Sequence, residues 1–76
     1  MYITIARVHE NLFSGQAVSI TAPGADGELT ILSTHEPLVV PLTKGIITVR
    51  TAEHGEVYEC EGGVLEVSNN QVTVLL

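Results

Sequence analysis

Regularly spaced turn signals constrain the fold more than any other feature of this sequence. Clusters rich in Gly, Pro, Asn and His recur about every eight to twelve residues, and the runs between them are short and rich in Val, Ile and Thr. No stretch of ten or more residues repeats its apolar side chains with the 3.6-residue period of a helix. This pattern is typical of a sandwich or small barrel and predicts an all-β fold with essentially no helix.

The periodicity predicts eight strands, all within one domain that covers residues 1–76. The predicted strands are residues 2–8, 16–21, 28–32, 38–41, 46–51, 57–61, 64–68 and 71–76. Residues 9–14 and 23–27 are among the predicted breaks.

The pairing register of two predicted hairpins follows from counting residues outward from a two-residue loop. Asn tolerates positive φ, so Asn69 and Asn70 suit a two-residue loop that pairs Ser68 with Gln71 and Leu65 with Val74. Apolar side chains then share one face and polar side chains the other, as a half-buried hairpin requires.

A second two-residue loop is predicted at His54 and Gly55. It would pair Val49 with Cys60 and make a cross-strand ion pair of Arg50 and Glu59. In this register Val49, Thr51, Tyr58 and Cys60 share the face that we expect to be buried.

The charge balance excludes several classes of partner. Three basic residues against nine acidic residues give a formal net charge of −6. Nucleic acid and anionic lipid surfaces need clustered Lys and Arg, so neither is an expected partner, whereas a basic protein surface is compatible. The most lipid-like run, residues 38–42, is too short to span a bilayer, and no signal peptide is recognisable. We therefore expect a cytoplasmic protein without direct membrane insertion.

The sequence contains no recognisable catalytic or cofactor motif. His9, His35 and His54 lie far apart on different predicted loops, which argues against a metal site. Cys60 alternates with Glu59 and Glu61, so it is expected in the core rather than at a reactive site. We expect no catalytic residue, no metal and no cofactor.

Several blocks in a fixed order resemble the N-terminal β-sandwich of the epsilon subunit of F-type ATP synthase. They are Leu12-Phe13-Ser14-Gly15, Gly27-Glu28-Leu29-Thr30-Ile31, His35-Glu36-Pro37-Leu38, Gly62-Gly63-Val64-Leu65-Glu66-Val67 and Asn70-Gln71-Val72-Thr73-Val74-Leu75. The resemblance extends from near residue 1 to the last residue.

The resemblance implies a flattened two-sheet antiparallel β-sandwich of about ten strands. It also implies a non-catalytic structural and coupling role in the central stalk, or rotor, where the domain links the gamma subunit to the polar loops of the c-ring. The location implied is the cytoplasmic face of the bacterial inner membrane, as part of a membrane-bound complex.

The resemblance also assigns contact residues. The c-ring contact would be Ala25, Asp26, Gly27 and Glu28, although these four also suit an ordinary solvated turn. The gamma contact would comprise Arg7, Phe13, His35, Leu38 and Val40. Phe13 suits a second role equally well, as a cap on the core.

The sequence departs from the family pattern at several points. Leu32-Ser33-Thr34-His35 replaces a Tyr-Pro-Gly-His turn, Glu36 replaces a small residue, and Pro41 favours an edge position. The usual subunit continues into two inhibitory C-terminal helices, which this sequence does not contain, so we expect a naturally short subunit or a truncated one. The inhibitory and nucleotide-sensing roles of those helices are not expected here.

Two other functions fit a small β-domain. A free-standing β-sandwich that binds peptide or carbohydrate would need a broad aromatic surface, and only Tyr2, Phe13 and Tyr58 are available to build one. A metal-dependent enzyme of the cupin kind would need converging His and carboxylate ligands. The neighbours His35 and Glu36 would point to opposite faces of a strand, which disfavours it.

Overall fold

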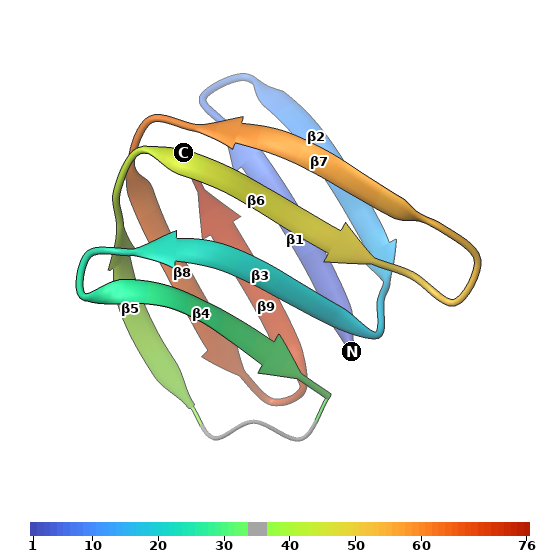
Figure 1. Ribbon diagram of the computed structural model, residues 1–76. Coiled ribbons are helices and arrows are strands. Elements are labelled where there is room, and N and C mark those ends of the chain that lie inside the picture. Colours follow the sequence, from blue (N-terminus) through green and yellow to red (C-terminus); the bar gives the residue numbers. More distant parts are fainter. Residues whose placement is uncertain (34–36) are drawn as a thin grey trace.

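A computed structural model describes residues 1–33 and 37–76 of the protein (Figure 1). These residues form nine strands. The strands are β1 (Tyr2–Arg7), β2 (Glu10–Gln16), β3 (Ser19–Gly24), β4 (Gly27–Leu32), β5 (Leu38–Leu42), β6 (Gly45–Arg50), β7 (Gly55–Cys60), β8 (Gly63–Ser68) and β9 (Gln71–Leu75). No helix that could cross a membrane occurs in the described part of the chain. The prediction of an all-β fold is confirmed.

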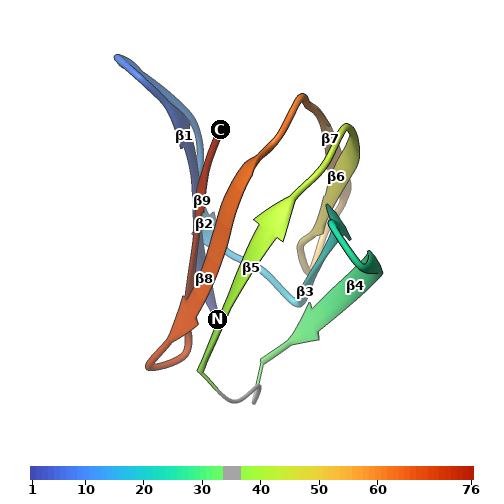
Figure 2. The same cartoon turned by 90° about the vertical axis from the view of Figure 1, so that its left-hand side faces the viewer.

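The strands belong to one hydrogen-bonded sheet in the order β2-β1-β9-β8-β5-β3-β6-β7, with β4 paired to β3. The sheet curls until its two halves face each other (Figure 2). We call β2, β1, β9, β8 and β5 the first half-sheet, and β4, β3, β6 and β7 the second half-sheet.

Three details differ from the expected sandwich. A bridge between Gly24 and Leu42 joins the two layers into one continuous sheet, where two sheets were predicted. Nine strands are described where about ten were expected. Finally, β1 pairs with β9 in parallel, whereas the predicted sheets were antiparallel.

The corner between the half-sheets requires a glycine. Gly24 is buried, and a Cβ on it would lie 2.8 Å from Leu29 Cδ2, 3.3 Å from Val40 Cγ1 and 2.7 Å from the Gly27 carbonyl oxygen. The side chains of Leu29 on β4 and Val40 on β5 therefore converge over Gly24, which explains how the sheet turns so sharply here.

The core lies between the two half-sheets and is entirely apolar among the described residues. Its largest fully buried side chains alternate along the strands, as period-2 patterning predicts. They are Ile3, Ile5, Ile20, Ile31, Ile47, Leu65, Val49, Val72, Val74 and Cys60. Cys60 is buried, as predicted, and its thiol donates to the Thr43 carbonyl oxygen at 3.3 Å.

The hairpin between β8 and β9 has the predicted register. Ser68 pairs with Gln71 and Leu65 pairs with Val74. Asn69 and Asn70 have φ angles of 51° and 61°, the left-handed conformation that this type of two-residue turn requires.

The predicted register of the hairpin between β6 and β7 is wrong. Val49 pairs with Glu56 and not with Cys60, and Glu59 lies opposite Ile46, so the Arg50–Glu59 ion pair does not form. The loop comprises residues 51–54, closed by a bond from the Thr51 amide to the His54 carbonyl oxygen at 2.8 Å. The register differs from the prediction by an even number of residues, so each side chain keeps its predicted face.

Strand β2 occupies the segment that was predicted as a break at residues 9–14. It pairs with β1 through a register shift between Ile5 and Ala6, which accommodates one extra residue on β2. His9, at φ 67°, lies in the turn that precedes it. The bulge disturbs the period-2 pattern, so the strand is not visible from alternation alone.

Candidate functional site

A row of apolar side chains crosses the outer face of the first half-sheet. The pairings Pro41–Val64, Val64–Leu75 and Leu75–Ala6 place these four residues side by side on β5, β8, β9 and β1. Val39 lies on the same face of β5, two residues before Pro41. We call these five residues the outer strip; the strands that carry them belong to the first half-sheet (Figure 2).

The outer strip is open to solvent. Leu75 is 58% exposed, Val39 65% and Val64 42%. Their neighbours Leu65 and Val74 point inward and are fully buried, so β8 and β9 carry apolar side chains on both faces at the position of the strip. A contiguous apolar row on the outside of a small domain is typical of a protein contact surface.

Polar side chains border the strip on one side. The next row across the same face pairs Val39 with Glu66, Glu66 with Thr73, and Thr73 with Thr4. An apolar centre beside a polar rim is the usual arrangement of a protein interface.

The residues predicted to contact gamma do not share one outward surface. Leu38 and Val40 pair with the buried residues Val67 and Leu65, so they face inward and are half-buried. Phe13 pairs with Ile5 and also packs against the core. Arg7 is exposed at the end of β1, and His35 lies outside the described residues. The gamma contact of these five residues stays a prediction.

Sequence reasoning missed the outer strip as a surface. Residues 38–42 are all apolar, so alternation could not show which side chains face outward. The adjacent apolar residues Val74 and Leu75 could have indicated this surface, because one of two neighbouring strand residues must face away from the core.

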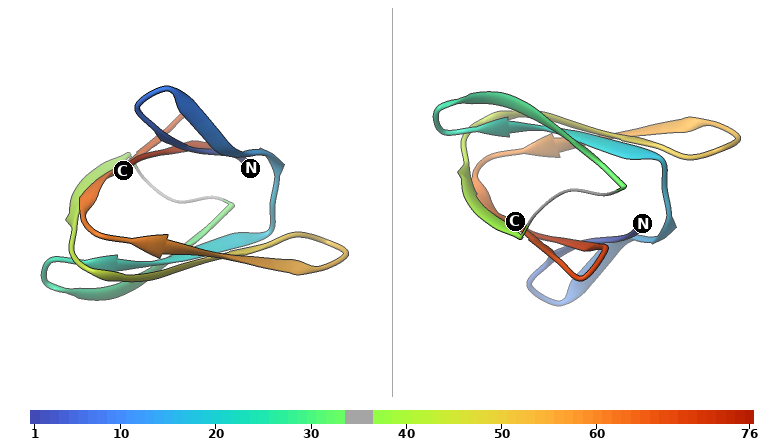
Figure 3. Two further views of the ribbon diagram at one scale, coloured as in Figure 1. Left: turned by 90° about the horizontal axis from the view of Figure 1, so that it is seen from above. Right: turned by 90° about the horizontal axis from the view of Figure 1, so that it is seen from below.

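The residues predicted to contact the c-ring form a tight, exposed turn between β3 and β4. Ala25, Asp26, Gly27 and Glu28 are all exposed, and Gly27 has a φ of 131° that favours glycine. The turn lies at the opposite side of the molecule from the projecting hairpin between β6 and β7 (Figure 3). Exposure permits a contact but does not test it, so the c-ring contact also stays a prediction.

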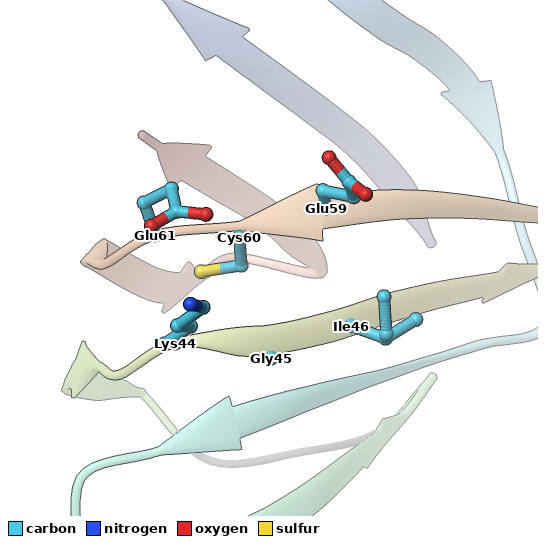
Figure 4. Close-up of a pocket in the computed structure, with 6 residues that line it drawn as sticks. All are labelled: Lys44, Gly45, Ile46, Glu59, Cys60 and Glu61. Atoms are coloured by element: carbon cyan, nitrogen blue, oxygen red, sulfur yellow. The ribbon is translucent and has the colours of Figure 1, made fainter.

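The concave features of the surface are small. One pocket of about 170 Å³ is lined by Lys44, Gly45, Ile46, Glu59, Cys60 and Glu61 (Figure 4). A second, of about 330 Å³, is lined by Arg7, Glu59, Glu61, Gly62 and Leu76. The first is smaller than the pockets of roughly 300–1,000 Å³ that usually hold small ligands, and the second is at their lower limit. No group of three or more metal-ligating side chains assembles within residues 1–33 and 37–76.

Three polar side chains on β7 and in the loop before it are linked by hydrogen bonds. The Tyr58 hydroxyl donates to Glu56 Oε1 at 2.5 Å, and His54 Nε2 lies 2.9 Å from Glu56 Oε2. The hydrogen bond from Tyr58, followed by that from His54, lowers the pKa of Glu56 below its ordinary value of 4.5. Burial, followed by the hydrogen bond to Glu56, raises the pKa of Tyr58 to about 12.

The fold and its surfaces define a class of protein: a small all-β domain with an exposed apolar strip on one outer face. The model of the family "ATP synthase, Delta/Epsilon chain, beta-sandwich domain" matches residues 1–76. The chain belongs to this family.

Curated relatives agree with this assignment. The chain is 46% identical over 77 residues to the ATP synthase epsilon chain of Acinetobacter baylyi, covering 99% of this chain and 55% of that protein. The chain is 36% identical over 76 residues to the ATP synthase epsilon chain of Delftia acidovorans, again covering 99% of this chain and 55% of that protein. The chain thus spans about half the length of these relatives.

Solved structures show the same fold. A chain of the mitochondrial ATP synthase of Euglena gracilis, in a structure of OSCP, F1 and c-ring, superposes with a TM-score of 0.86 at 28% identity. That match covers 96% of this chain and 48% of the other. A chain in a structure of the central stalk and c-ring of Tetrahymena thermophila mitochondrial ATP synthase superposes with a TM-score of 0.84 at 16% identity. That match covers 97% of this chain and 60% of the other, and it supports the fold alone.

Proposed function

We propose that this chain is a non-catalytic coupling domain of the ATP synthase rotor that links the gamma subunit to the c-ring. The observation that carries the proposal is the outer strip, an apolar surface of the kind that a permanent partner covers. The family assignment and the structural relative from an assembly of OSCP, F1 and c-ring support another subunit of ATP synthase as that partner.

The gamma subunit is the expected partner of the outer strip. Val39, Val64 and Leu75 present exposed apolar area that would be removed from water on docking. Arg7 is exposed at the end of β1, the strand that also carries Ala6 of the strip. The contact of gamma with Arg7, Phe13, His35, Leu38 and Val40 is a separate part of the proposal, because Phe13, Leu38 and Val40 lie on the inner face of the first half-sheet and not in the outer strip.

The acidic turn between β3 and β4 is the expected contact with the c-ring. Asp26 and Glu28 are exposed there, and the chain carries a net charge of −6. Such a surface attracts polar or basic loops and repels acidic ones. We place the assembled domain at the cytoplasmic face of the bacterial inner membrane, held there through its partners.

Matched charge insertions test the gamma contact. Leu75→Asp places a carboxylate in the outer strip, whereas Val57→Asp does the same on the outer face of the second half-sheet at a similar exposure of 64%. Leu75→Asp should weaken binding to purified gamma about tenfold or more, because a charge would be buried without a partner. Val57→Asp should leave the affinity within about twofold of the unmodified chain.

Both variants are compared at equal folded fraction, measured by circular dichroism. Equal losses of affinity in the two variants, or no binding of gamma by the unmodified chain, would contradict the proposed function.

A further inference from the structure

Strand β7 is an open edge of the sheet. It lies at one end of the strand order, and β6 is the only strand paired with it among the described residues (Figure 1). Its residues pair with those of β6 in one continuous register. The other end of the order, β2, carries the bulge between Ile5 and Ala6. Since β7 also contains no proline, it is the more regular of these two edges and the better template for a further strand.

The hydrogen-bond pattern shows which backbone groups face this edge. In an antiparallel pair, opposite residues alternate between those that exchange hydrogen bonds and those that do not. The Thr51 amide donates across the loop to the His54 carbonyl oxygen, which fixes where the alternation starts. In agreement, the Arg50 carbonyl oxygen points away from β7 and accepts from the Val18 amide at 2.7 Å. The β7 residues whose backbone amide and carbonyl groups point away from β6 are therefore Gly55, Val57 and Glu59.

The outward backbone groups of β7 are available to another chain. Within residues 1–33 and 37–76, no hydrogen bond uses the outward groups of Val57 and Glu59. A row of such groups is a template on which an extended segment can form a strand. In strand addition the main-chain hydrogen bonds supply affinity, and pockets for alternate side chains supply specificity.

The charge of this edge indicates what kind of strand fits it. Residues 53–61 contain four glutamates and no lysine or arginine. Glu59 on β7 and Glu61 just after it are exposed, and in the described part of the chain neither has an ion-pair partner. A second copy of β7 laid along the edge would bring glutamates against glutamates, which is unfavourable. The charge therefore disfavours self-pairing and favours a basic strand.

Both pockets described above lie beside the end of β7. Each is lined by Glu59 and Glu61, whose side chains are drawn at the smaller pocket in Figure 4. Alternate side chains of an added strand would share one face with Glu59 and reach this end of β7. A lysine or arginine there would be attracted by two carboxylates, because charge-assisted hydrogen bonds are the strong ones.

We propose that β7 binds an extended polypeptide segment rich in lysine or arginine, which adds as a further strand to the second half-sheet. Backbone hydrogen bonds to Val57 and Glu59 supply the affinity, and the carboxylates of Glu59 and Glu61 select basic side chains. This inference goes beyond the proposed rotor function. It concerns the half-sheet opposite the outer strip, and its test uses neither gamma nor the c-ring.

Hydrogen exchange measured by NMR tests the proposal with a defined probe, a blocked heptapeptide of alternating threonine and lysine. In the free chain the amides of Val57 and Glu59 should exchange quickly, whereas that of Tyr58, which faces β6, should exchange slowly. The peptide should slow exchange at Val57 and Glu59 about tenfold or more. Slow exchange at both residues in the free chain, or no added protection with the peptide at about 2 mM, would overturn the proposal.

Matched peptides separate strand addition from simple charge attraction. A peptide with glutamate in place of lysine should not bind, because it meets the acidic edge with like charge. N-methylation of every threonine, or of every lysine, removes the amide donors along one edge of the peptide and keeps its charge. One of these two peptides should bind about threefold to tenfold more weakly than the parent. Equal binding of the lysine and glutamate peptides, or of the parent and both N-methylated peptides, would contradict the added strand.

Variants of the chain test the two contributions separately. Glu59→Gln combined with Glu61→Gln should weaken binding of the lysine peptide about threefold or more. Glu10→Gln combined with Glu28→Gln removes the same net charge elsewhere and should change it less than about 1.5-fold. Val57→Pro removes an outward amide that β6 does not use and should weaken binding about threefold to tenfold, whereas Val57→Thr should not. If Val57→Pro does not fold, the N-methylated peptides test the backbone contribution.

Two further outcomes would overturn the proposal. Equal losses of affinity in the two glutamate pairs would mean that overall charge, and not the β7 edge, attracts the peptide. Protection of the Val57 amide that rises with protein concentration in the absence of peptide would assign the edge to a second copy of this chain. Neither result bears on the proposed contacts with gamma and the c-ring.

Discussion

Individual residues matter most where the backbone leaves no room for a side chain. At Gly63 a Cβ would lie 2.1 Å from the Leu75 carbonyl oxygen, and φ is 141°. Gly63 begins β8 directly beside the end of β9, so any larger residue must push these strands apart. Gly24 has a similar role at the corner of the sheet.

We expect Gly63→Ala to destabilise the fold by about 3 kcal/mol or more, through both the clash and the backbone strain. Denaturant unfolding would measure it. Gly55→Ala is the matched control: its Cβ would lie 3.6 Å from the nearest backbone oxygen, so we expect a change of less than about 0.5 kcal/mol. Comparable losses at both glycines would contradict the assignment of Gly63 as a position without space.

Tyr58 should titrate far above the ordinary tyrosine value. In a Tyr2→Phe background, phenolate absorbance should report a midpoint near 12. Because the folded pKa is raised above the ordinary 10.0, this group's contribution to stability is complete below pH 10 and is lost as pH rises towards 12. Glu56→Gln should lower the midpoint, since it removes the negative acceptor; an unchanged midpoint would rule out the Tyr58–Glu56 hydrogen bond.

Acidification acts on the other member of this pair. The folded pKa of Glu56 lies below its ordinary 4.5, so its contribution to stability is present above pH 4.5 and is lost as pH falls below it. The unmodified chain should therefore lose more stability than Glu56→Gln between pH 5 and pH 3, when both are unfolded with urea at each pH. Parallel losses in the two proteins would argue against this role for the carboxylate.

At the scale of elements, the loop between β6 and β7 depends on one side chain. Thr51 Oγ1 accepts from the amides of Glu53 and His54 at 3.3 and 3.1 Å, and it donates to the His54 carbonyl oxygen at 3.0 Å. These contacts select the four-residue loop and set the register of β7.

Thr51→Val keeps the shape of the residue but removes these bonds, so it should cost about 1–2 kcal/mol of hairpin stability. Hydrogen exchange should show faster opening of the β6–β7 amides. Thr48→Val, on β6 and away from the loop, should leave that exchange unchanged. If exchange in the hairpin is the same in both variants, Thr51 does not define the loop.

The loop between β6 and β7 also shows which features the sequence does not reveal. At Asn69 and Asn70 the turn is encoded by two residues that accept positive φ, so local chemistry was sufficient. At Thr51 the turn is closed by side-chain bonds that span three residues, which the pairing arithmetic did not include. Strand β2 was missed because its bulge breaks alternation. The outer strip needed the register of four strands, which no single segment contains.

At the scale of the whole molecule, the outer strip and the acidic turn occupy different places. The outer strip lies across β5, β8, β9 and β1, and the acidic turn lies between β3 and β4. Two separate surfaces would allow a small domain to hold two partners at once, as the proposed coupling role requires.

Neutralising the turn should test the second surface. Asp26→Asn combined with Glu28→Gln should weaken docking to purified c-ring and flatten its dependence on salt, because the local carboxylates carry the attraction. Glu10→Gln combined with Glu53→Gln removes the same net charge elsewhere and should have little effect. Equal effects of the two pairs would indicate attraction by overall charge and not by the turn.

The position of β9 has a consequence for how the protein is made. The last strand lies in the interior of the first half-sheet, between β8 and β1, and pairs in parallel with the first. Until β9 has been synthesised, β1 has only β2 beside it, and its buried face remains uncovered. The layer can be completed only after residue 75 leaves the ribosomal exit tunnel, so folding should follow synthesis of this segment instead of accompanying it.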